Sequence, residues 1–224
     1  MAKVSVILPA AGAGRRFGGG KSKIFQPLLG KAVFLHALER LSGRSDVIQT
    51  LLVVSRRDIR ELEEHYGREL RRLGAEIVEG GSDRTGSVRN ALAKVSGDAE
   101  LVCVHDAVRP CVRDEQIDAV FAAAETYGAA ILAAPVHATL KQSADGARIS
   151  RTVSREGLWQ AQTPQVFRRE LLLEAYSTGA AATDDAELVQ RLGHEVRLVE
   201  SDARNVKITK PADLALAERI LRSQ

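Results

Sequence analysis

Short apolar runs alternate with amphipathic runs along most of this chain, and this alternation limits its fold more than any other feature. Strands are expected where β-branched and aliphatic residues cluster, at residues 4–9, 50–55, 75–80, 101–106 and 129–136. Helical spacing of apolar residues is found at 32–42, 57–72, 84–96 and 114–127. The strands are mostly apolar rather than alternating, which is typical of parallel strands covered on both faces. We therefore expect an α/β, Rossmann-like fold, with a mostly parallel twisted sheet and helices on both faces.

The remaining helices continue this pattern toward the C-terminus. Within 114–127, one apolar stripe is formed by Ile117, Val120, Phe121 and Ala124, and Asp114 is expected as the N-cap. Further helices are expected at 168–179, 183–192 and 211–222, with a strand at 195–201. Thr183 or Asp184 is expected to cap the second of these helices, and Pro211 suits the first turn of the last.

The alternation breaks at residues 137–158, where polar and apolar residues alternate around Asp145-Gly146. An Asp-Gly pair in such a setting is the strongest short-range signal for a β-hairpin. Because an isolated hairpin is only marginally stable in water, we expect this protruding arm to pack on a second copy of the chain and form a homodimer. The chain shows no internal repeat or linker, so residues 1–224 are expected to form one domain with this arm.

Charge and composition exclude several classes of protein. The 224 residues carry 32 Lys and Arg against 29 Asp and Glu, a net charge of +3, and the arginines are scattered. Binding to nucleic acid would need a concentrated basic patch, so it is not expected. No apolar run reaches the ~18 residues of a membrane span, and the N-terminus lacks a signal-peptide pattern. Cys103 and Cys111 suit reduced, buried thiols, so a cytoplasmic protein is expected.

A glycine-rich stretch, LPAAGAGRRFGGGKSK at residues 8–23, follows the first expected strand. In α/β sheets, ligands bind beyond the carboxyl ends of the strands. Glycines let backbone amides approach a ligand closely, and successive amides can form a nest for phosphate oxygens. The stretch also carries four cations, namely Arg15, Arg16, Lys21 and Lys23. It therefore predicts a site that holds a triphosphate and stabilises the charge that develops on it during reaction.

A nicotinamide cofactor is the alternative for this stretch. Gly12, Gly14 and Gly18 loosely resemble the dinucleotide fingerprint, although their spacing is GxGxxxG rather than GxGxxG. The second expected strand ends in Ser55-Arg56-Arg57, where the fingerprint needs an acidic residue. An arginine there could hold the phosphate of NADP, so an NADP-binding oxidoreductase stays open. The stretch has no Walker A spacing.

Five further motifs join this stretch in one resemblance. They are GGSDRTGSVRNAL (80–92), VHDAVRPC (104–111), TVSREGLWQAQTPQVF (152–167), TDDA (183–186) and NVKITKPADLALAE (205–218). The chain resembles the nucleotidyltransferases that join an NTP to a sugar or polyol phosphate, and within them the 2-C-methyl-D-erythritol 4-phosphate cytidylyltransferases of non-mevalonate isoprenoid synthesis. The resemblance runs from residue 4 to about 220. The chain departs from the family at Ser22-Lys23-Ile24, where Pro-Lys-Gln is common, and at Ser82, where aspartate is frequent.

The resemblance implies a single nucleotidyltransferase domain that transfers CMP from CTP to the polyol phosphate and releases pyrophosphate. Ribitol-5-phosphate cytidylyltransferase shares the loop and the Asp106 motif, so it stays open as an alternative. Transition-state stabilisation is implied for Arg16 and Lys23, and contact with the reacting phosphates for Lys207. The implied nucleotide contacts are Pro9, Ala10, Ala11, Gly12, Ala13, Gly14, Gly81, Ser82, Ser87 and Ala107. The implied substrate contacts are Asp106, Arg109, Thr139, Arg155, Thr163 and Thr183, of which Thr139 and Arg155 reach the site of the neighbouring subunit from the arm.

Asp106 is the expected metal ligand. It ends an apolar strand beside the predicted triphosphate site, where a lone carboxylate could instead cap a turn or pair with Arg109. Mg²⁺ takes one or two carboxylates and fills its other positions with phosphate oxygens and water, and the aspartate of HDAxRP is also the metal residue of the family. We expect His105 to fix local structure and Trp159 to be a packing anchor at the base of the arm.

Overall fold

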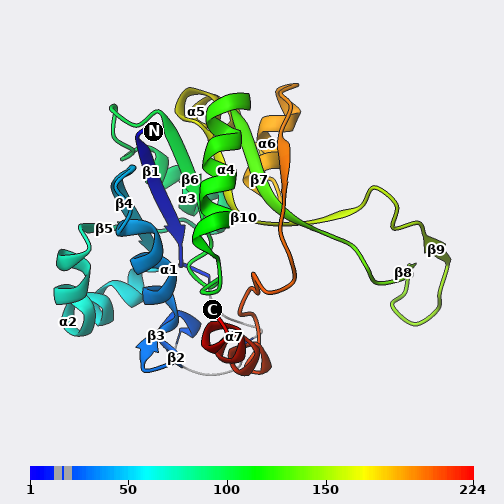
Figure 1. Ribbon diagram of the computed structural model, residues 1–224, viewed down its shortest axis with the longest axis horizontal. Coiled ribbons are helices and arrows are strands. Elements are labelled where there is room, and N and C mark those ends of the chain that lie inside the picture. The colour runs from blue at the N-terminus through cyan, green and yellow to red at the C-terminus, as the bar shows by residue number, and fades with distance from the viewer. Residues whose placement is uncertain (13–16, 18–21) are drawn as a thin grey trace.

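The computed structural model describes residues 1–12, 17 and 22–224, and a seven-stranded sheet forms its centre (Figure 1). In spatial order the strands are β11 (Arg197–Glu200), β7 (Ala129–Pro135), β10 (Trp159–Arg168), β6 (Leu101–Val104), β1 (Val4–Pro9), β4 (Val47–Val54) and β5 (Ala75–Glu79). Every pair is parallel except those of β10, which runs antiparallel to both β6 and β7. The mostly parallel sheet is confirmed, whereas β10 was not expected as a strand.

Helices cover both faces of the sheet because alternate strand residues point to opposite sides. In β1, Val6 and Leu8 join one apolar core, and Ile7 joins the other. The first core is completed by α1 (Val33–Ser42), α2 (Arg56–Arg72), α4 (Asp114–Tyr127) and α7 (Ala212–Arg222). The second is completed by α3 (Arg84–Leu92), α5 (Arg169–Ser177) and α6 (Asp185–Arg191). The strands are thus buried between two helical layers, as their continuous apolar character predicted.

The structure corrects the predicted ends of three helices. Asp114 is the first residue of α4 rather than its cap, because its carboxylate pairs with Arg40 at 3.0 Å and Arg113 occupies the cap position. The helix expected at 84–96 ends at Leu92, and the residues that follow form turns. Pro211 occupies the N-cap position of α7 rather than its first turn. The apolar stripe of α4 is buried as expected.

A short connection leads from the glycine-rich stretch to α1. It consists of the 3₁₀ turn η1 (Lys23–Phe25) and the hairpin of β2 (Pro27–Leu28) and β3 (Lys31–Ala32). Ile24 is fully buried, and the Phe25 ring stacks on the Tyr66 ring with centroids 5.7 Å apart. This packing fixes the backbone directly after Lys23.

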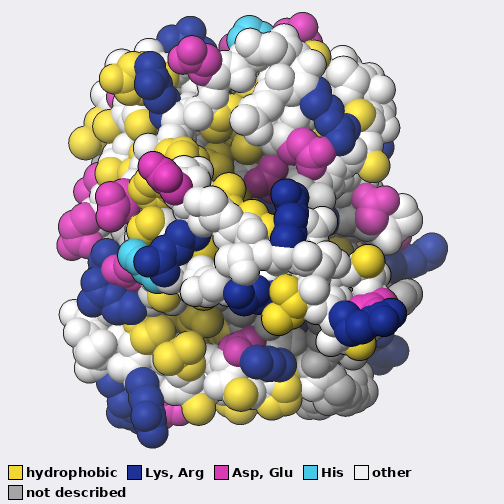
Figure 2. Space-filling view, turned by 90° about the vertical axis from the view of Figure 1, so that its right-hand side faces the viewer, with side chains coloured by type: hydrophobic (Ala, Val, Ile, Leu, Met, Phe, Trp, Pro, Cys, Tyr) yellow, Lys and Arg dark blue, Asp and Glu magenta, His cyan; other side chains and the backbone are white. Residues whose placement is uncertain are grey.

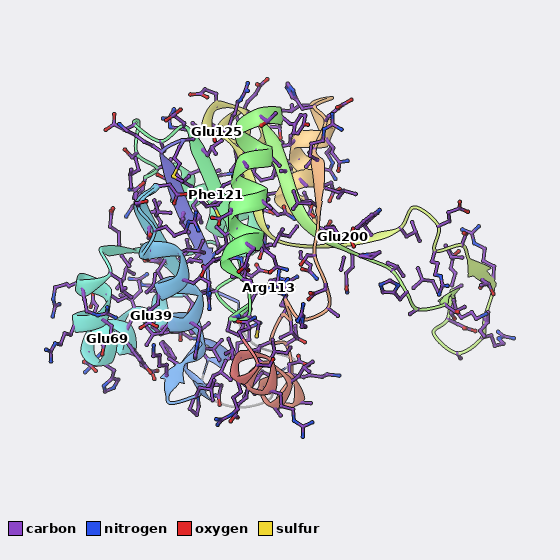
Figure 3. The ribbon with its side chains drawn as sticks, in the orientation of Figure 1. Glu39, Glu69, Arg113, Phe121, Glu125 and Glu200 are labelled. Atoms are coloured by element: carbon purple, nitrogen blue, oxygen red, sulfur yellow. The ribbon has the colours of Figure 1, made fainter. Side chains whose placement is uncertain are left out.

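The arm is a separate two-stranded sheet of β8 (Leu140–Gln142) and β9 (Arg151–Val153), and it extends away from the body in Figure 1. The carboxylate of Asp145 accepts hydrogen bonds from the amides of Ala147 and Arg148, and Gly146 has φ +73°. The side chains of the arm stand clear of the body in Figure 3, where Glu200 marks the end of β11 near the root of the arm. The expected hairpin is confirmed.

Two other expectations concern burial and hydropathy. Cys103 and Cys111 are both buried and free, as expected. Among the residues that the structure describes, no helix combines the length and the apolar content that crossing a membrane requires.

Candidate active site

A cavity of about 520 Å³ lies at the carboxyl edge of the sheet, lined in part by the segments that follow β1, β5 and β6. The chain runs from β1 to β4 and β5 on one side and then crosses to β6 on the other, and such a switch point opens a crevice in the sheet. The cavity is lined by Pro9, Ala10, Ala11, Gly12, Lys23, Gly81, Ser82, Asp83, Arg84, Ser87, Asp106, Val108 and Lys207. All of these except Asp83, Arg84 and Val108 were site residues predicted from the sequence. The predicted residues Ala13, Gly14 and Arg16 lie outside the described residues.

Two glycines let the loop after β5 reach the cavity. A Cβ at Gly80 would lie 2.6 Å from the Cβ of Ala11, and one at Gly81 would lie 2.7 Å from the carbonyl carbon of Gly86. The Ser87 hydroxyl accepts from the Gly81 amide at 3.1 Å and donates to a backbone carbonyl. Ser87 therefore holds the loop against the start of α3, in addition to lining the cavity.

Asp106 lies among three cations at the floor of the site. Its Oδ2 is 2.7 Å from Lys207 Nζ and 3.7 Å from Arg109 Nε. Its Oδ1 is 3.6 Å from Arg84 Nε. Burial by itself raises the pKa of Asp106, but the charges of Lys207, Arg84 and Arg109 lower it by more, so this pKa lies well below its usual range. The carboxylate is ionised, and the positive charge around it favours an anionic ligand.

The segment that carries Lys207 is tied to the other cations of the site. Arg109 Nη1 donates to the carbonyl of Asn205 at 2.7 Å, and Lys23 Nζ donates to the carbonyl of Ile208 at 3.3 Å. Residues from η1, from the turn after β6 and from the segment before α7 therefore meet at one point. Contacts between segments this far apart in the sequence could not be read from local patterns.

His105 fixes the position of Asp106. Thr163 Oγ1 accepts from the Asp106 amide at 3.0 Å, which leaves its own proton to donate to His105 Nδ1 at 3.1 Å. His105 Nε2 then carries the proton and donates to the Arg109 carbonyl at 3.1 Å. Burial lowers the pKa of His105 to about 4. The imidazole is therefore neutral and structural, as expected from the sequence.

Acid is expected to destabilise the fold through His105. Because its pKa falls from 6.5 to about 4 on folding, its stabilising contribution is complete above pH 6.5 and is lost as the pH falls toward 4. The slope is at most about 1.4 kcal/mol per pH unit. We expect the free energy of unfolding of the metal-free chain, measured in urea with EDTA, to decline over this range and to decline less in His105→Gln. Equal slopes in the two proteins would contradict this assignment.

Four predicted residues are not among those that line the cavity. Three of them, Ala107, Arg109 and Thr163, are buried. Thr183, just before α6, donates through its amide and its hydroxyl to Glu187 at 2.7 and 2.9 Å. Thr163 and Arg109 act on Asp106 through the contacts described above, whereas Thr183 has no such contact among the described residues.

The two predicted residues on the arm are not brought to the cavity of their own chain. Thr139 and Arg155 are both exposed, and neither lines the cavity. Arg155 Nη1 donates to the carbonyl of His137, which holds its side chain along the arm. Trp159, expected as a packing anchor, is 38% exposed at the start of β10.

Sequence reasoning missed Arg84, the first residue of α3. Its Nη1 and Nη2 donate to both carboxylate oxygens of Asp185 at 3.0 and 2.6 Å. An arginine at a helix start beside a glycine turn was the available signal, but its partner lies 101 residues further along the chain.

The donors for a metal ion are few. Among the described residues, no group of three or more His, Cys, Asp or Glu side chains converges. Of the two carboxylates on the cavity wall, that of Asp83 accepts from the Gly86 amide at 2.7 Å as the N-cap of α3. Asp106 Oδ1 has only the 3.6 Å contact with Arg84 in the described part of the chain. One carboxylate fits Mg²⁺ that arrives with nucleotide phosphates, but would not by itself hold the ion in a protein cage.

Among the described residues, charged side chains of both signs are mixed on the face that carries the arm. Figure 2 shows Lys and Arg side chains spread over this face among acidic and uncharged atoms.

Comparison with known proteins agrees with this site. The family "IspD: 2-C-methyl-D-erythritol 4-phosphate cytidylyltransferase" matches residues 4–223. The protein of that name from Rhodopirellula baltica is 44% identical, over 98% of this chain and 95% of its own, and that from Bacillus velezensis is 39% identical, over 98% and 96%. The crystal structure of the Thermus thermophilus protein of the same name has a TM-score of 0.80 at 35% identity, and covers 99% of this chain and 100% of its own. These matches remove the oxidoreductase alternative, and the chain belongs to the 2-C-methyl-D-erythritol 4-phosphate cytidylyltransferase family.

Proposed function

We propose that this chain transfers CMP from CTP to 2-C-methyl-D-erythritol 4-phosphate. The products are 4-diphosphocytidyl-2-C-methyl-D-erythritol and pyrophosphate, and the reaction belongs to the non-mevalonate route to isoprenoid precursors. The observation that carries the proposal is the cavity at the switch point, where Lys23 and Lys207 flank the ionised Asp106. Membership in the family supports the choice of substrates.

The nucleotide is proposed to lie across the two glycine-containing loops. Gly12 follows β1, and Gly81 follows β5, on adjoining parts of the cavity wall. Ser82 and Ser87 supply hydroxyl groups on the same wall. In the proposed arrangement, the base lies toward α3 and the phosphates lie toward the cations around Asp106.

The chemistry needs positioning more than acid–base catalysis. The acceptor is a phosphate monoester, so one of its oxygens is already an anionic nucleophile. It attacks the α-phosphorus of CTP in line, a new P–O bond forms, and the bond to the β-phosphate oxygen breaks to release pyrophosphate. Lys23 and Lys207 bring the two anions together and offset the charge that gathers in the transition state. Arg16, outside the described residues, has the same proposed role.

Mg²⁺ is the proposed cofactor, with Asp106 as its protein ligand. The single available carboxylate oxygen matches an ion that takes its other ligands from the triphosphate and water. When bound, the ion neutralises phosphate charge. Lys207 would then share Asp106 with the ion, which keeps its ammonium close to the reacting phosphates.

The acceptor is proposed to be held by two subunits. Strand β7 ends and β10 begins at the same edge of the sheet as the cavity, so the arm leaves the body beside the site. We propose that the arm of each subunit places Thr139 and Arg155 in the cavity of its partner. In that arrangement Arg155 orients the phosphate of the acceptor, together with Arg109, Thr163 and Thr183 of the subunit that owns the cavity.

A cytoplasmic location is proposed from the two thiols. Cys103 and Cys111 are buried and free, and free thiols persist in reducing compartments. Burial raises the pKa of both thiols, so they stay protonated and react slowly.

A grid of substrates tests the proposed function. Pyrophosphate release is measured with four NTPs against 2-C-methyl-D-erythritol 4-phosphate and ribitol 5-phosphate, with Mg²⁺ and with EDTA. We expect CTP with the methylerythritol phosphate to give the highest kcat/KM, by at least about 10-fold over every other pair, and EDTA to abolish it. A faster reaction with ribitol 5-phosphate would overturn the choice of acceptor.

A further inference from the structure

Arg84 combines two environments in one side chain. It lines the cavity and keeps 27% of its side chain exposed, while its guanidinium forms a fork with a carboxylate that is 0% exposed. Nη1 and Nη2 donate to Asp185. Nε faces Asp106 at 3.6 Å, which is too long for a hydrogen bond. The described part of the chain therefore gives the Nε proton no acceptor within hydrogen-bond distance, and Nε faces Asp106, which also lines the cavity.

Asp185 is itself held rigidly. Tyr176 donates its hydroxyl to Asp185 Oδ1 at 2.5 Å, and the Asp185 amide donates to Gln165 Oε1 at 3.1 Å. Gln165 lies in β10 at the centre of the sheet. The orientation of Arg84 is thus set from the sheet through Gln165 and Asp185, before any ligand binds.

The guanidinium of Arg84 is suited to donate hydrogen bonds at short range rather than to attract anions from a distance. Asp185 neutralises most of the charge of Arg84, so long-range attraction of an anion falls to other groups. Arg84 instead presents fixed N–H donors close to Asp106. It does so from the start of α3, the helix that borders the proposed nucleotide site. Asp185 takes two of the five N–H donors of the guanidinium. The other three remain for phosphate oxygens in a fixed plane, a geometry that a lysine cannot reproduce.

We propose that Arg84 is a further substrate-binding residue, which donates to phosphate oxygens of the bound nucleoside triphosphate, and that Asp185 positions it. This inference rests on the proposed function and deepens it. Asp185 does not touch the substrate and acts only through Arg84. Arg84→Lys keeps the charge beside Asp185, but an ammonium group lacks the planar set of five N–H donors that binds both oxygens of Asp185 and still leaves donors for a phosphate.

Arg44 offers a matched control. It also forms a fork with a buried carboxylate, that of Asp46, at 3.0 and 2.8 Å, and it contacts Asp118 at 2.7 Å. It precedes β4, at the amino edge of the sheet opposite the cavity. Arg44→Lys therefore removes a comparable buried fork without touching the site.

Titration calorimetry with CTP and Mg²⁺, together with Tm, tests the inference. We expect Arg84→Lys to raise the Kd for CTP at least about 10-fold, the lower range for a hydrogen bond to a charged group, and Arg44→Lys to leave it within about 2-fold while lowering Tm. Asp185→Asn should also weaken CTP binding, and in the double variant with Arg84→Lys the two losses should not add.

Each outcome separates this inference from the proposed function. Equal Kd values in Arg84→Lys and wild type, or losses that simply add in the double variant, would overturn the role of Arg84 or of its positioning by Asp185. A wild-type chain that binds CTP but releases no pyrophosphate with the methylerythritol phosphate would contradict the proposed function and leave the Kd comparison intact. A wild-type chain that binds no CTP would overturn both.

Discussion

Lys23→Ala is expected to lower kcat by at least about 100-fold, the usual cost of removing one donor that stabilises the charge of a transition state. Lys23 lies on the cavity wall, and its ammonium donates to the Ile208 carbonyl at 3.3 Å, in the residue next to Lys207. This contact brings Lys23 beside the segment that carries Lys207, so in the proposed mechanism both ammonium groups act on the same phosphates. The neighbouring Ile24 and Phe25 are buried, so truncation of Lys23 leaves the backbone of the turn anchored.

Lys31→Ala is the control for this variant. Lys31 belongs to the same short connection, but its ammonium pairs with Glu39 at 2.6 Å on the surface and does not line the cavity. Its loss should leave kcat unchanged, because an exposed ion pair contributes little. Pyrophosphate release under saturating substrates measures both variants, and near wild-type turnover in Lys23→Ala would remove Lys23 from the mechanism.

The fold was predictable where burial is reflected in local hydropathy. The strands β1, β6 and β7 are almost wholly apolar because both their faces are covered, and α4 shows its stripe for the same reason. Strand β10 was missed because its buried residues include Gln162 and Gln165. Their side chains are satisfied by Asn205, Asp184 and the start of α6. A polar residue that is buried because a distant segment supplies its partner has no signature in its own neighbourhood.

Most residues of the site could be predicted from the sequence, but most of the contacts between them could not. The rule that ligands bind at the carboxyl ends of parallel strands, together with the family motifs, located Lys23, Asp106 and Lys207, which the structure brings to one cavity. The connection of Asp106 to His105 through Thr163 and the fork of Arg84 with Asp185 depend on side-chain contacts across different elements. Such contacts follow from the completed fold and not from spacing along the chain.

The second large effect on turnover is expected at Arg155, an arm residue that we propose to act in the cavity of the partner subunit. Arg155 is exposed on the arm and does not line its own cavity. If it orients the acceptor in the partner's cavity, Arg155→Ala should lose about 100-fold in turnover, although the cavity of that chain is intact. Arg148→Ala is the matched control, because Arg148 is also an exposed arm arginine, and among the described residues its side chain pairs with Asp145 near the hairpin turn. Its activity should stay near that of wild type.

Mixing two inactive variants distinguishes a shared site from a damaged fold. In a dimer of one Lys23→Ala chain and one Arg155→Ala chain, one cavity combines the intact Lys23 of the second chain with the intact Arg155 of the first, and the other cavity lacks both groups. After equal amounts of the two proteins exchange subunits at random, half of the dimers are mixed and half of their sites are complete. About a quarter of wild-type turnover should therefore return. Arg155 acting within its own chain would give no recovery once mass spectrometry has shown mixed dimers, because each chain would still lack one of the two groups.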